Sequence, residues 1–246
     1  MDRMLVEFVE KIEELAGPAP TIVVDGQEFH TRQLRPVMAP QVEPVKVNTL
    51  TGLVDLLKAK VEEFEPGGSL VHVENFDSVK VITRESDGWQ RRDCLVHATL
   101  KNHGEGFHFG QKYGAEAFNI ALQTLFVDRP TRAELLRLVG NLKSAELRTA
   151  EDDGVSQIAT LRAGVHLAGE EKIPNPVSLC PWRTFREITQ PESLFVFRLH
   201  GGDDGLPSCS LLEADGGKWK LDAIQAVAKW LDTELRAAQL TIPVIA

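Results

Sequence analysis

Residues 69–100 alternate between apolar and polar side chains over several short runs, and this alternation constrains the fold more than any other feature of the sequence. Val71 and Val73 begin the pattern, and similar valine pairs follow. Because successive side chains of a strand point to opposite faces, such runs predict strands with one buried face. Asp87-Gly88 is a dipeptide typical of tight hairpin turns. The segment therefore predicts a three-stranded antiparallel meander that covers a core with one face.

Amphipathic helices are predicted on both sides of this meander. Apolar side chains recur with a 3.6-residue period from residue 50 onward, and Pro66 with the two following glycines ends the pattern. Thr131 and Glu134 have the spacing of a capping box at the start of a later helix. We predict helices over residues 5–15, 50–64, 115–126, 132–142 and 217–238.

The second half of the chain is richer in strand patterns. Short runs such as ELRTA, WRTFREI, SLFVFRL and SCSLLEA lie between turns rich in Pro and Gly, which is typical of antiparallel strands. The last helix has an apolar face that Trp219 and Trp230 widen, so we expect it to dock on the preceding sheet. The prediction is an α+β fold with antiparallel sheets, packed amphipathic helices and a C-terminal helix docked on a β-rich second half.

The expected division of the chain follows from the same patterns. Residues 1–145 form a mixed half of helices and meander, and residues 146–246 form a β-rich half closed by the C-terminal helix. No Pro- or Ser-rich linker marks the joint. We therefore expect one intimately packed unit rather than two independent domains.

The charge of the chain limits its partners and its location. The net charge is −9, from 36 acidic and 27 basic side chains, whereas proteins that neutralise phosphates usually carry the opposite excess. Nucleic-acid binding is therefore disfavoured and would need a local basic patch. The cysteines are scattered without a CxxC pair, as in a reducing compartment. The acidic first residues resemble neither a signal peptide nor a membrane span, so we expect a cytoplasmic protein and no membrane partner.

None of the familiar catalytic or ligand-binding patterns is complete. His103 and His108 flank Glu105 without the spacing of a zinc site. The segment EADGGKWK at 213–220 leads from a strand into a helix but lacks the first glycine and the Ser/Thr of a P-loop. There is no GxSxG nucleophile motif. We expect no catalytic residue, no cofactor and no metal, and the sequence favours a protein that is not an enzyme.

One segment interleaves aromatic and basic residues and supplies the candidate interaction face. The face consists of Trp182, Arg183, Arg186 and Arg198. On strands, such a face could stack nucleic-acid bases or grip a partner protein. Alternatively, the neighbouring phenylalanines form the core and the arginines pair with surplus acids. The sequence favours the second interpretation and leaves the first open.

Several stretches, read in series, resemble a family of uncharacterised bacteriophage and prophage proteins. They are NTLTGLVDLL, LVHVENFDSVKV, DDGVSQIATLRAGV, PWRTFREITQPESLFVFRL and LEADGGKWKLDAI. The similarity runs from about residue 45 to the end of the chain, and the YfdQ-like prophage proteins look like a more distant relation. The resemblance implies an infected or lysogenic bacterial host and a gene among early accessory or DNA-metabolism genes. It supplies no catalytic residues.

Three functions are compatible with these observations. The first is a phage-encoded, non-enzymatic accessory protein that acts by binding a host or defence factor or a small ligand, as a homo-oligomer. The second is a single-stranded DNA-binding or recombination accessory factor that uses the face at residues 182–198. The third is a self-assembling component of a ring or shell.

Overall fold

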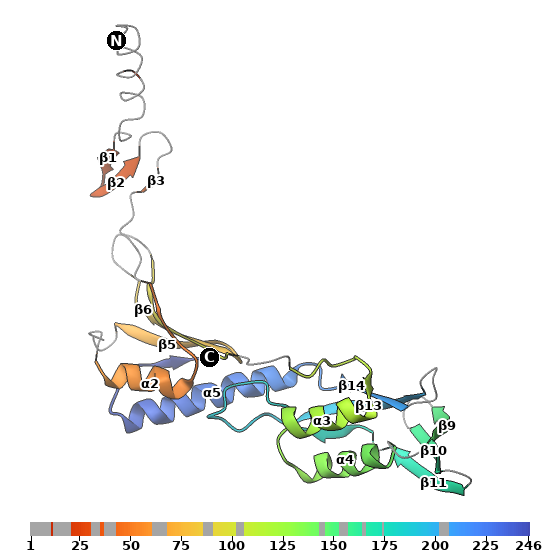
Figure 1. The fold of residues 1–246 in the computed structure, drawn as a ribbon. Helices are drawn as coiled ribbons and strands as arrows, with labels where there is room; N and C mark the ends of the chain where they lie inside the picture. The colour runs from red at the N-terminus through yellow and green to blue at the C-terminus, as the bar shows by residue number, and fades with distance from the viewer. Residues whose placement is uncertain are drawn as a thin grey trace, which may run out of the picture.

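A computed structural model of the chain shows an α+β fold, with helices packed on antiparallel and mixed sheets (Figure 1). The structure describes residues 11, 21–30, 35–36, 43–60, 68–85, 91–101, 106–142, 146–152, 157–163, 166–173, 175–201 and 207–246. The helix predicted over residues 5–15 and the turn predicted at Asp87-Gly88 lie outside these residues, Lys11 excepted.

The first lobe is built on a five-stranded sheet with the strand order β15-β5-β6-β7-β4. Its strands are β4 (Val45–Val47), β5 (Ser69–Asn75), β6 (Ser78–Thr83), β7 (Cys94–Thr99) and β15 (Val244–Ile245). The central three strands are antiparallel, which confirms the predicted meander. The two edge strands, β4 and β15, pair in parallel with their neighbours.

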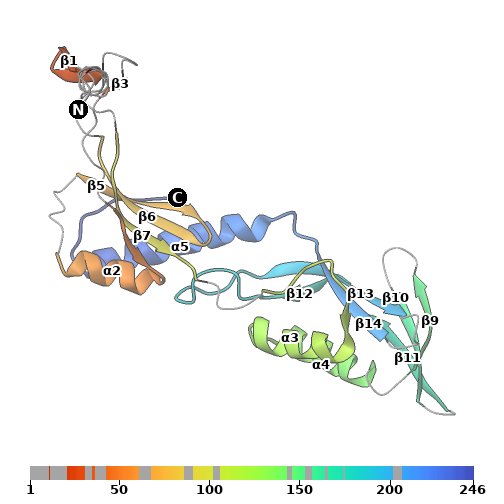
Figure 2. The same cartoon turned by 45° about the horizontal axis from the view of Figure 1, so that its top comes forward.

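Two helices cover one face of this sheet, α2 (Leu50–Lys58) and α5 (Lys218–Ala237), and they lie side by side in Figures 1 and 2. In α2 the buried side chains recur at helical spacing, beginning with Leu50 and Leu53. They meet valines at alternate positions of the strands, which are completely buried at Val71 and Val81. The two periodicities therefore bury their apolar faces against each other.

The second lobe has a four-stranded sheet with the order β12-β13-β14-β8. Its strands are β8 (Tyr113–Gly114), β12 (Val177–Leu179), β13 (Ser193–Gly201) and β14 (Pro207–Glu213), and its helices are α3 (Ala115–Leu125) and α4 (Pro130–Leu142). The core between helices and sheet is rich in aromatic rings, of which Phe118, Phe195 and Phe197 are fully buried. Thr131 is therefore not a helix cap, because α4 already begins at Pro130, a favoured residue at a first helical position.

Two smaller sheets complete the described part of the chain. One consists of β9 (Glu146–Asp152), β10 (Gln157–Ala163) and β11 (His166–Ile173), which are antiparallel. The other consists of β1 (Thr21–Val24), β2 (Gln27–His30) and β3 (Arg35–Pro36). Its tight turn has positive φ angles at Asp25 (52°) and Gly26 (80°), as a two-residue hairpin turn requires. Both ribbon views draw this small sheet apart from the two lobes (Figures 1 and 2).

The C-terminal helix does not dock where we expected. Helix α5 buries Val227, Leu231 and Leu235 in the core of the first lobe, beside α2 and β5, and not on the sheet that precedes it in the chain. The periodicity of the helix shows that one face is apolar but does not show which sheet that face covers. The predicted boundary near residue 145 remains a prediction about domains. The two lobes do not follow it, since the chain returns to the first lobe at α5.

The segment WRTFREI, predicted as a strand, forms an irregular loop between β12 and β13. We call residues 181–190 the bridging segment, because the segment belongs to the second lobe in sequence while Phe185 and Ile188 are buried in the core of the first. The prediction of a strand at WRTFREI is therefore wrong. None of the helices that the structure describes is long and apolar enough to cross a membrane.

Candidate functional site at the junction of the lobes

A cavity of about 500 Å³ lies where the two lobes meet, and we call it the junction cavity. The first lobe contributes the turn from β4 to α2, the turn from β5 to β6, and the end of β7. The bridging segment and the start of α5 supply most of the remaining wall. Its aromatic residues are Phe76, Phe107, Phe109, Trp182 and Trp219, and its cationic residues are Lys101, Arg183 and Arg186.

The bridging segment is shaped by one buried side chain, Gln190, which is 4% exposed. Its Oε1 accepts hydrogen bonds from the backbone N–H groups of Arg183 (2.9 Å) and Thr184 (3.1 Å). Its Nε2 donates to the carbonyl of Phe185 (2.9 Å). One amide side chain thus satisfies backbone groups that would otherwise pair in a ladder, so the loop can turn back inside the protein.

Two further contacts hold the bridging segment against both lobes. The Trp182 N–H donates to the carbonyl of Leu125 at the end of α3 (2.9 Å). The hydroxyl of Thr184 donates to the carbonyl of Phe76 in the turn between β5 and β6. The wall of the junction cavity is therefore attached to each lobe by hydrogen bonds as well as by packing.

The side chain of Arg183 is buried in this wall. Its guanidinium carbon lies 3.8 Å from the centroid of the Trp219 ring, and 5.6 Å and 5.7 Å from those of Phe195 and Phe109. The side chain is 10% exposed and forms an ion pair with Glu213. Burial lowers the pKa of the guanidinium to about 10, against the opposing effect of Glu213, so it stays charged at neutral pH. Arg183 therefore behaves as the second interpretation of the sequence proposed, paired with an acid and packed among aromatic rings.

Lys101 and Arg186 are different, because both are exposed and neither forms an ion pair with a described carboxylate. The guanidinium carbon of Arg186 lies 4.2 Å from the centroid of the Trp182 ring. Trp182 keeps 37% of its surface exposed. None of the lining residues in the part of the chain that the structure describes is acidic. The cavity is thus locally cationic in an acidic protein.

The two helices that begin beside the cavity do not add to this positive charge. Glu187 Oε1 accepts a hydrogen bond from the Thr51 N–H in the first turn of α2 (3.1 Å). Asp215 Oδ1 accepts one from the Gly217 N–H just before α5 (3.0 Å). The N-cap of α5 is Gly217, with φ of 82°, and Asp215 lies two residues before it. Since a carboxylate already lies at the start of each helix, attraction of an anion to the cavity depends on its cationic side chains and not on the helix dipoles.

Two donors in the cavity wall are buried without a partner among the described residues. They are Nε of Arg183 and Nε1 of Trp219. Trp219 is only 5% exposed. Buried donors are nearly always paired in folded proteins, and each unpaired one costs about 1–3 kcal/mol. Both atoms are enclosed by protein, so they lie within the wall and do not face the open space of the cavity.

The structure brings together three of the four residues of the candidate interaction face, Trp182, Arg183 and Arg186. Arg198 lies in β13, half-buried, and does not line the cavity. It occupies the face of the strand opposite to Phe197, because side chains alternate. Sequence reasoning did not find Lys101 or the turn from β4 to α2, because nothing near them in sequence marks a site.

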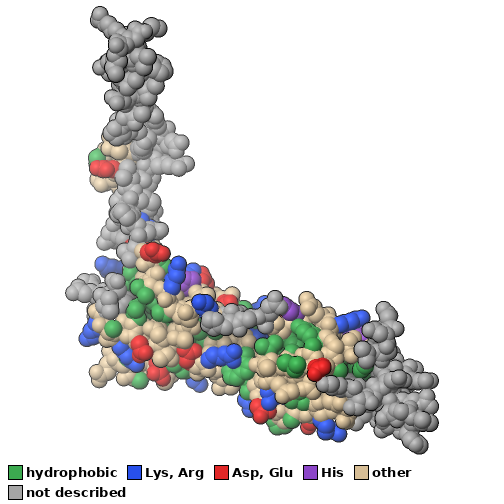
Figure 3. All heavy atoms as spheres, viewed as in Figure 1, with side chains coloured by type: hydrophobic (Ala, Val, Ile, Leu, Met, Phe, Trp, Pro, Cys, Tyr) green, Lys and Arg blue, Asp and Glu red, His purple; other side chains and the backbone are tan. Residues whose placement is uncertain are grey.

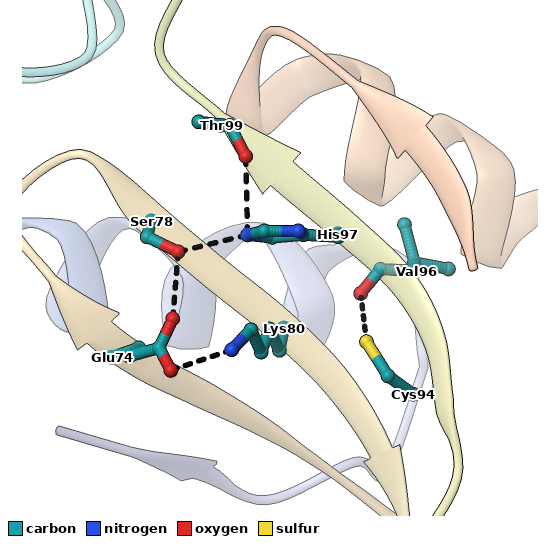
Figure 4. Close-up of polar contacts among 7 residues, drawn as sticks. All are labelled: Glu74, Ser78, Lys80, Cys94, Val96, His97 and Thr99. Atoms are coloured by element: carbon teal, nitrogen blue, oxygen red, sulfur yellow. Dashed lines mark hydrogen bonds and ion pairs between the residues drawn. The ribbon is translucent and has the colours of Figure 1, made fainter. Parts of the chain in front are cut away.

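Figure 4 shows a second polar cluster, on the face of the first sheet that α2 and α5 leave uncovered. The Ser78 hydroxyl lies 2.9 Å from Nε2 of His97 and 3.0 Å from Oε2 of Glu74. In a catalytic triad the acid orients the histidine, whereas here Glu74 binds the serine itself and Lys80. The hydrogen bond from Lys80 lowers the pKa of Glu74. We interpret this cluster as cross-strand surface pairing.

The two other kinds of site to consider are a nucleophilic cysteine and a metal site. Cys94 donates to the carbonyl of Val96 (3.4 Å) and does not face His97 in Figure 4. Desolvation raises the pKa of its thiol, which disfavours the nucleophilic thiolate. Among the described residues, no three His, Cys, Asp or Glu side chains are grouped so that they could hold a metal ion. His103 and Glu105 lie outside the described residues.

The visible face of the molecule carries charges of both signs. Figure 3 shows Lys and Arg side chains beside Asp and Glu over both lobes, so the negative charge is not gathered into one patch on that side.

Comparison with known proteins adds no relative: the chain matches no family model, no curated protein and no solved structure. Any function proposed for this chain therefore rests on the residues that line the junction cavity.

Proposed function

We propose that this chain is a non-enzymatic binding protein that holds a small anionic ligand in the junction cavity. The observation that carries the proposal is the combination of five aromatic residues with two exposed cations, Lys101 and Arg186, that no described carboxylate neutralises. The volume of about 500 Å³ lies within the roughly 300–1,000 Å³ of small-molecule sites. Such a cavity has the size for a metabolite and the charge for an anion.

The aromatic wall would supply affinity as well as shape. Phe76 packs on Trp219 with ring centroids 4.7 Å apart, and Phe109 stacks on Phe195 at 5.0 Å. Rings fixed in this way lose little conformational freedom when a ligand binds, which lowers the cost of association. Lys101 and Arg186 are exposed, so an ion pair between either of them and a ligand is partly screened by water and adds to the affinity only modestly.

The proposed biological setting comes from the sequence resemblance. A phage or prophage accessory protein in the bacterial cytoplasm could act by sequestering a host-derived ligand or by occupying a host or defence factor. Sequestration requires binding and no chemistry, so it agrees with a cavity whose charged side chains are arranged around aromatic rings. It also needs no basic protein surface, since the cationic groups are local.

We extend the proposal to self-association through the small N-terminal sheet. Ile22, Val23 and Val24 are 42%, 66% and 49% exposed in consecutive positions of β1. Ile22 and Val24 share one face of the strand and Val23 lies on the other, because side chains alternate. A three-stranded sheet of this size gains little stability alone, so packing of the Ile22 and Val24 face on a second copy would bury exposed apolar surface. Light scattering should show an oligomer that Ile22→Asp dissociates. A monomer at high concentration would refute this part of the proposal.

The binding proposal is tested with a fluorescent aryl sulfonate as an aromatic anionic probe. We expect one probe molecule per native chain, with quenching of tryptophan fluorescence because Trp182 and Trp219 line the cavity. The double variant Lys101→Gln/Arg186→Gln should weaken binding by about ten-fold, since two exposed ion pairs contribute up to about 1 kcal/mol each.

The matched control for this experiment is Arg236→Gln. Arg236 is exposed on α5, far along the helix from Trp219, and pairs with Asp232. The control should bind the probe like the wild type. Equal binding by the control and by the double variant would place the probe elsewhere and refute the junction cavity as the site.

A second candidate function, binding of single-stranded DNA, is favoured by one observation. Trp182 is partly exposed and stacks on Arg186, which is the kind of platform on which bases stack. The net charge of −9 opposes it. Binding of the oligonucleotide (dT)8 at low salt that Trp182→Leu abolishes would support this candidate, and no binding by the full chain would exclude it.

A further inference from the structure

We infer that the open face of the first sheet binds a single strand of nucleic acid through its phosphate groups. This inference goes beyond the proposed function, because it concerns a surface outside the junction cavity. The surface is a line of basic side chains that crosses four strands, and we call it the basic row. It consists of His72 in β5, Lys80 in β6, His97 in β7 and Lys46 in β4.

The side chains of the basic row are direct cross-strand neighbours. In the register of the sheet His72 is paired with Lys80, and Lys80 is paired with His97. Lys46 is paired with His97 from the other side. Adjacent strands lie about 4.8 Å apart, so the row spans roughly 14 Å in a straight line. Like charges directly opposite each other destabilise a sheet, so the protonated row is more stable with an extended anion on it.

The basic row lies on the face of the sheet that α2 and α5 leave uncovered (Figure 4). The valines that precede or follow it along the strands, such as Val71, Val81 and Val96, are completely buried on the other face. The side chain of Lys46 is 73% exposed, and that of Lys80 is 30% exposed. Phosphate groups can therefore reach the row from solvent.

Two acids accompany the basic row and set its charge. Glu74 pairs with Lys80 at 2.5 Å, and Glu43 lies 4.0 Å from Lys46. On β15 the row ends at Ile245, which carries no charge. The two lysines and the two acids cancel, so the net charge of the row depends on its two histidines. Because imidazoles take up protons as the pH falls below neutral, binding of a polyanion should strengthen in that direction.

The connection from the basic row to the junction cavity favours nucleic acid over an acidic protein. Lys101 follows His97 by four positions, and the Leu100 N–H between them donates to the carbonyl of Asp77 (2.9 Å), as in a continued ladder. Alternation therefore places Lys101 on the same side as the row, at the edge of the cavity. The cavity also contains Trp182, which is 37% exposed. Bases of a single strand stack on such rings, whereas a run of acidic side chains gains nothing from them.

The test is fluorescence anisotropy of labelled (dT)8 with the full chain at low salt. We expect binding that strengthens at least three-fold between pH 7.5 and pH 6.0. His72→Gln/His97→Gln should remove this pH dependence and weaken binding at pH 6.0 by about five-fold or more, since two partly exposed ion pairs are lost. Lys46→Gln should reduce the slope of log affinity against log salt by about 0.7, as expected for the loss of one phosphate contact.

The matched control is Arg236→Gln, on the helix that covers the opposite face, which should bind (dT)8 like the wild type. Circular dichroism should show all variants folded. Wild-type affinity and pH dependence in the histidine variant would place the strand elsewhere and overturn the inference. Equal binding of an octamer of glutamate would also overturn it, because the row would then accept an acidic protein.

The two proposals fail separately. If the aryl sulfonate binds in the junction cavity but (dT)8 binds at neither pH, the inference about the basic row fails while the proposed function stands. If (dT)8 binds as described and the aryl sulfonate does not, the proposed function fails while the basic row is supported.

Discussion

The ion pair between Arg183 and Glu213 gives the sharpest test of how the lobes are held together. We expect Glu213→Gln to destabilise the fold, because it leaves a guanidinium that is 10% exposed without its counter-charge. Removing one partner of a fully buried pair costs about 3–5 kcal/mol, and a surface pair contributes about 0–1 kcal/mol. Glu213 is 37% exposed, which places this pair between the two limits. The expected loss is therefore about 2 kcal/mol.

Such a loss is measurable by urea unfolding followed through tryptophan fluorescence. For a chain of this size it corresponds to a fall in Tm of about 4–8 °C. Arg183→Met keeps most of the packing against Trp219 and removes the charge, so the double variant Arg183→Met/Glu213→Gln should be more stable than the sum of its single changes predicts. Asp232→Asn is the matched control, since it breaks the exposed Arg236 pair and should change stability by less than about 0.5 kcal/mol.

The reasoning would be refuted by additivity. If the two single changes and the double change fit a simple sum within about 0.5 kcal/mol, then Arg183 and Glu213 do not interact in the folded state. A loss for Glu213→Gln no larger than that for Asp232→Asn would lead to the same conclusion, because burial would then add nothing to the pair.

Three further predictions concern other parts of the structure. Gln190→Ala should cost about 2–4 kcal/mol in urea unfolding, because it orphans several buried backbone groups at once; a cost below about 1 kcal/mol would contradict this role. Lys80→Met should raise the pKa of Glu74, measured by NMR titration, toward its ordinary value of 4.5. Because the folded-state pKa lies below that value, the pairing stabilises the fold above pH 4.5 and is lost as the pH falls through the folded pKa; an unchanged pKa would exclude the pairing. Burial raises the pKa of Cys209 to about 12, so a thiol reagent at pH 8 should modify it only on unfolding, and rapid modification in the native protein, mapped by peptide mass, would contradict the structure.

The parts of the fold that the sequence predicts well are those that local patterns determine. The meander of β5, β6 and β7 follows from alternation, and the turn at Asp25-Gly26 follows from residues that tolerate positive φ. The loop at Trp182 is predicted as a strand because its residues are typical of strands. Its actual conformation is imposed by Gln190, whose hydrogen bonds replace those of a sheet.

Only the part of the candidate site that lies in one short segment can be predicted from the sequence. Trp182, Arg183 and Arg186 stand out in one short segment, and aromatic and basic residues so close together indicate an interaction site. Trp219 and Lys101 join them only through the packing of α5 and the end of β7. Local patterns contain no sign of that juxtaposition, because α5 packs on a sheet formed more than a hundred residues earlier.

The same residues that join the lobes also line the cavity, and this has a consequence for binding. Arg183 stacks on Trp219, and Thr184 holds the turn that carries Phe76. The cavity therefore keeps its shape only while the junction is intact, so part of the stability of the junction serves to preorganise the site. By the same linkage, a molecule that binds only the intact cavity stabilises the junction, in proportion to its affinity and concentration. The junction of the lobes and the binding of a ligand are thus two aspects of one packing arrangement, centred on a buried arginine.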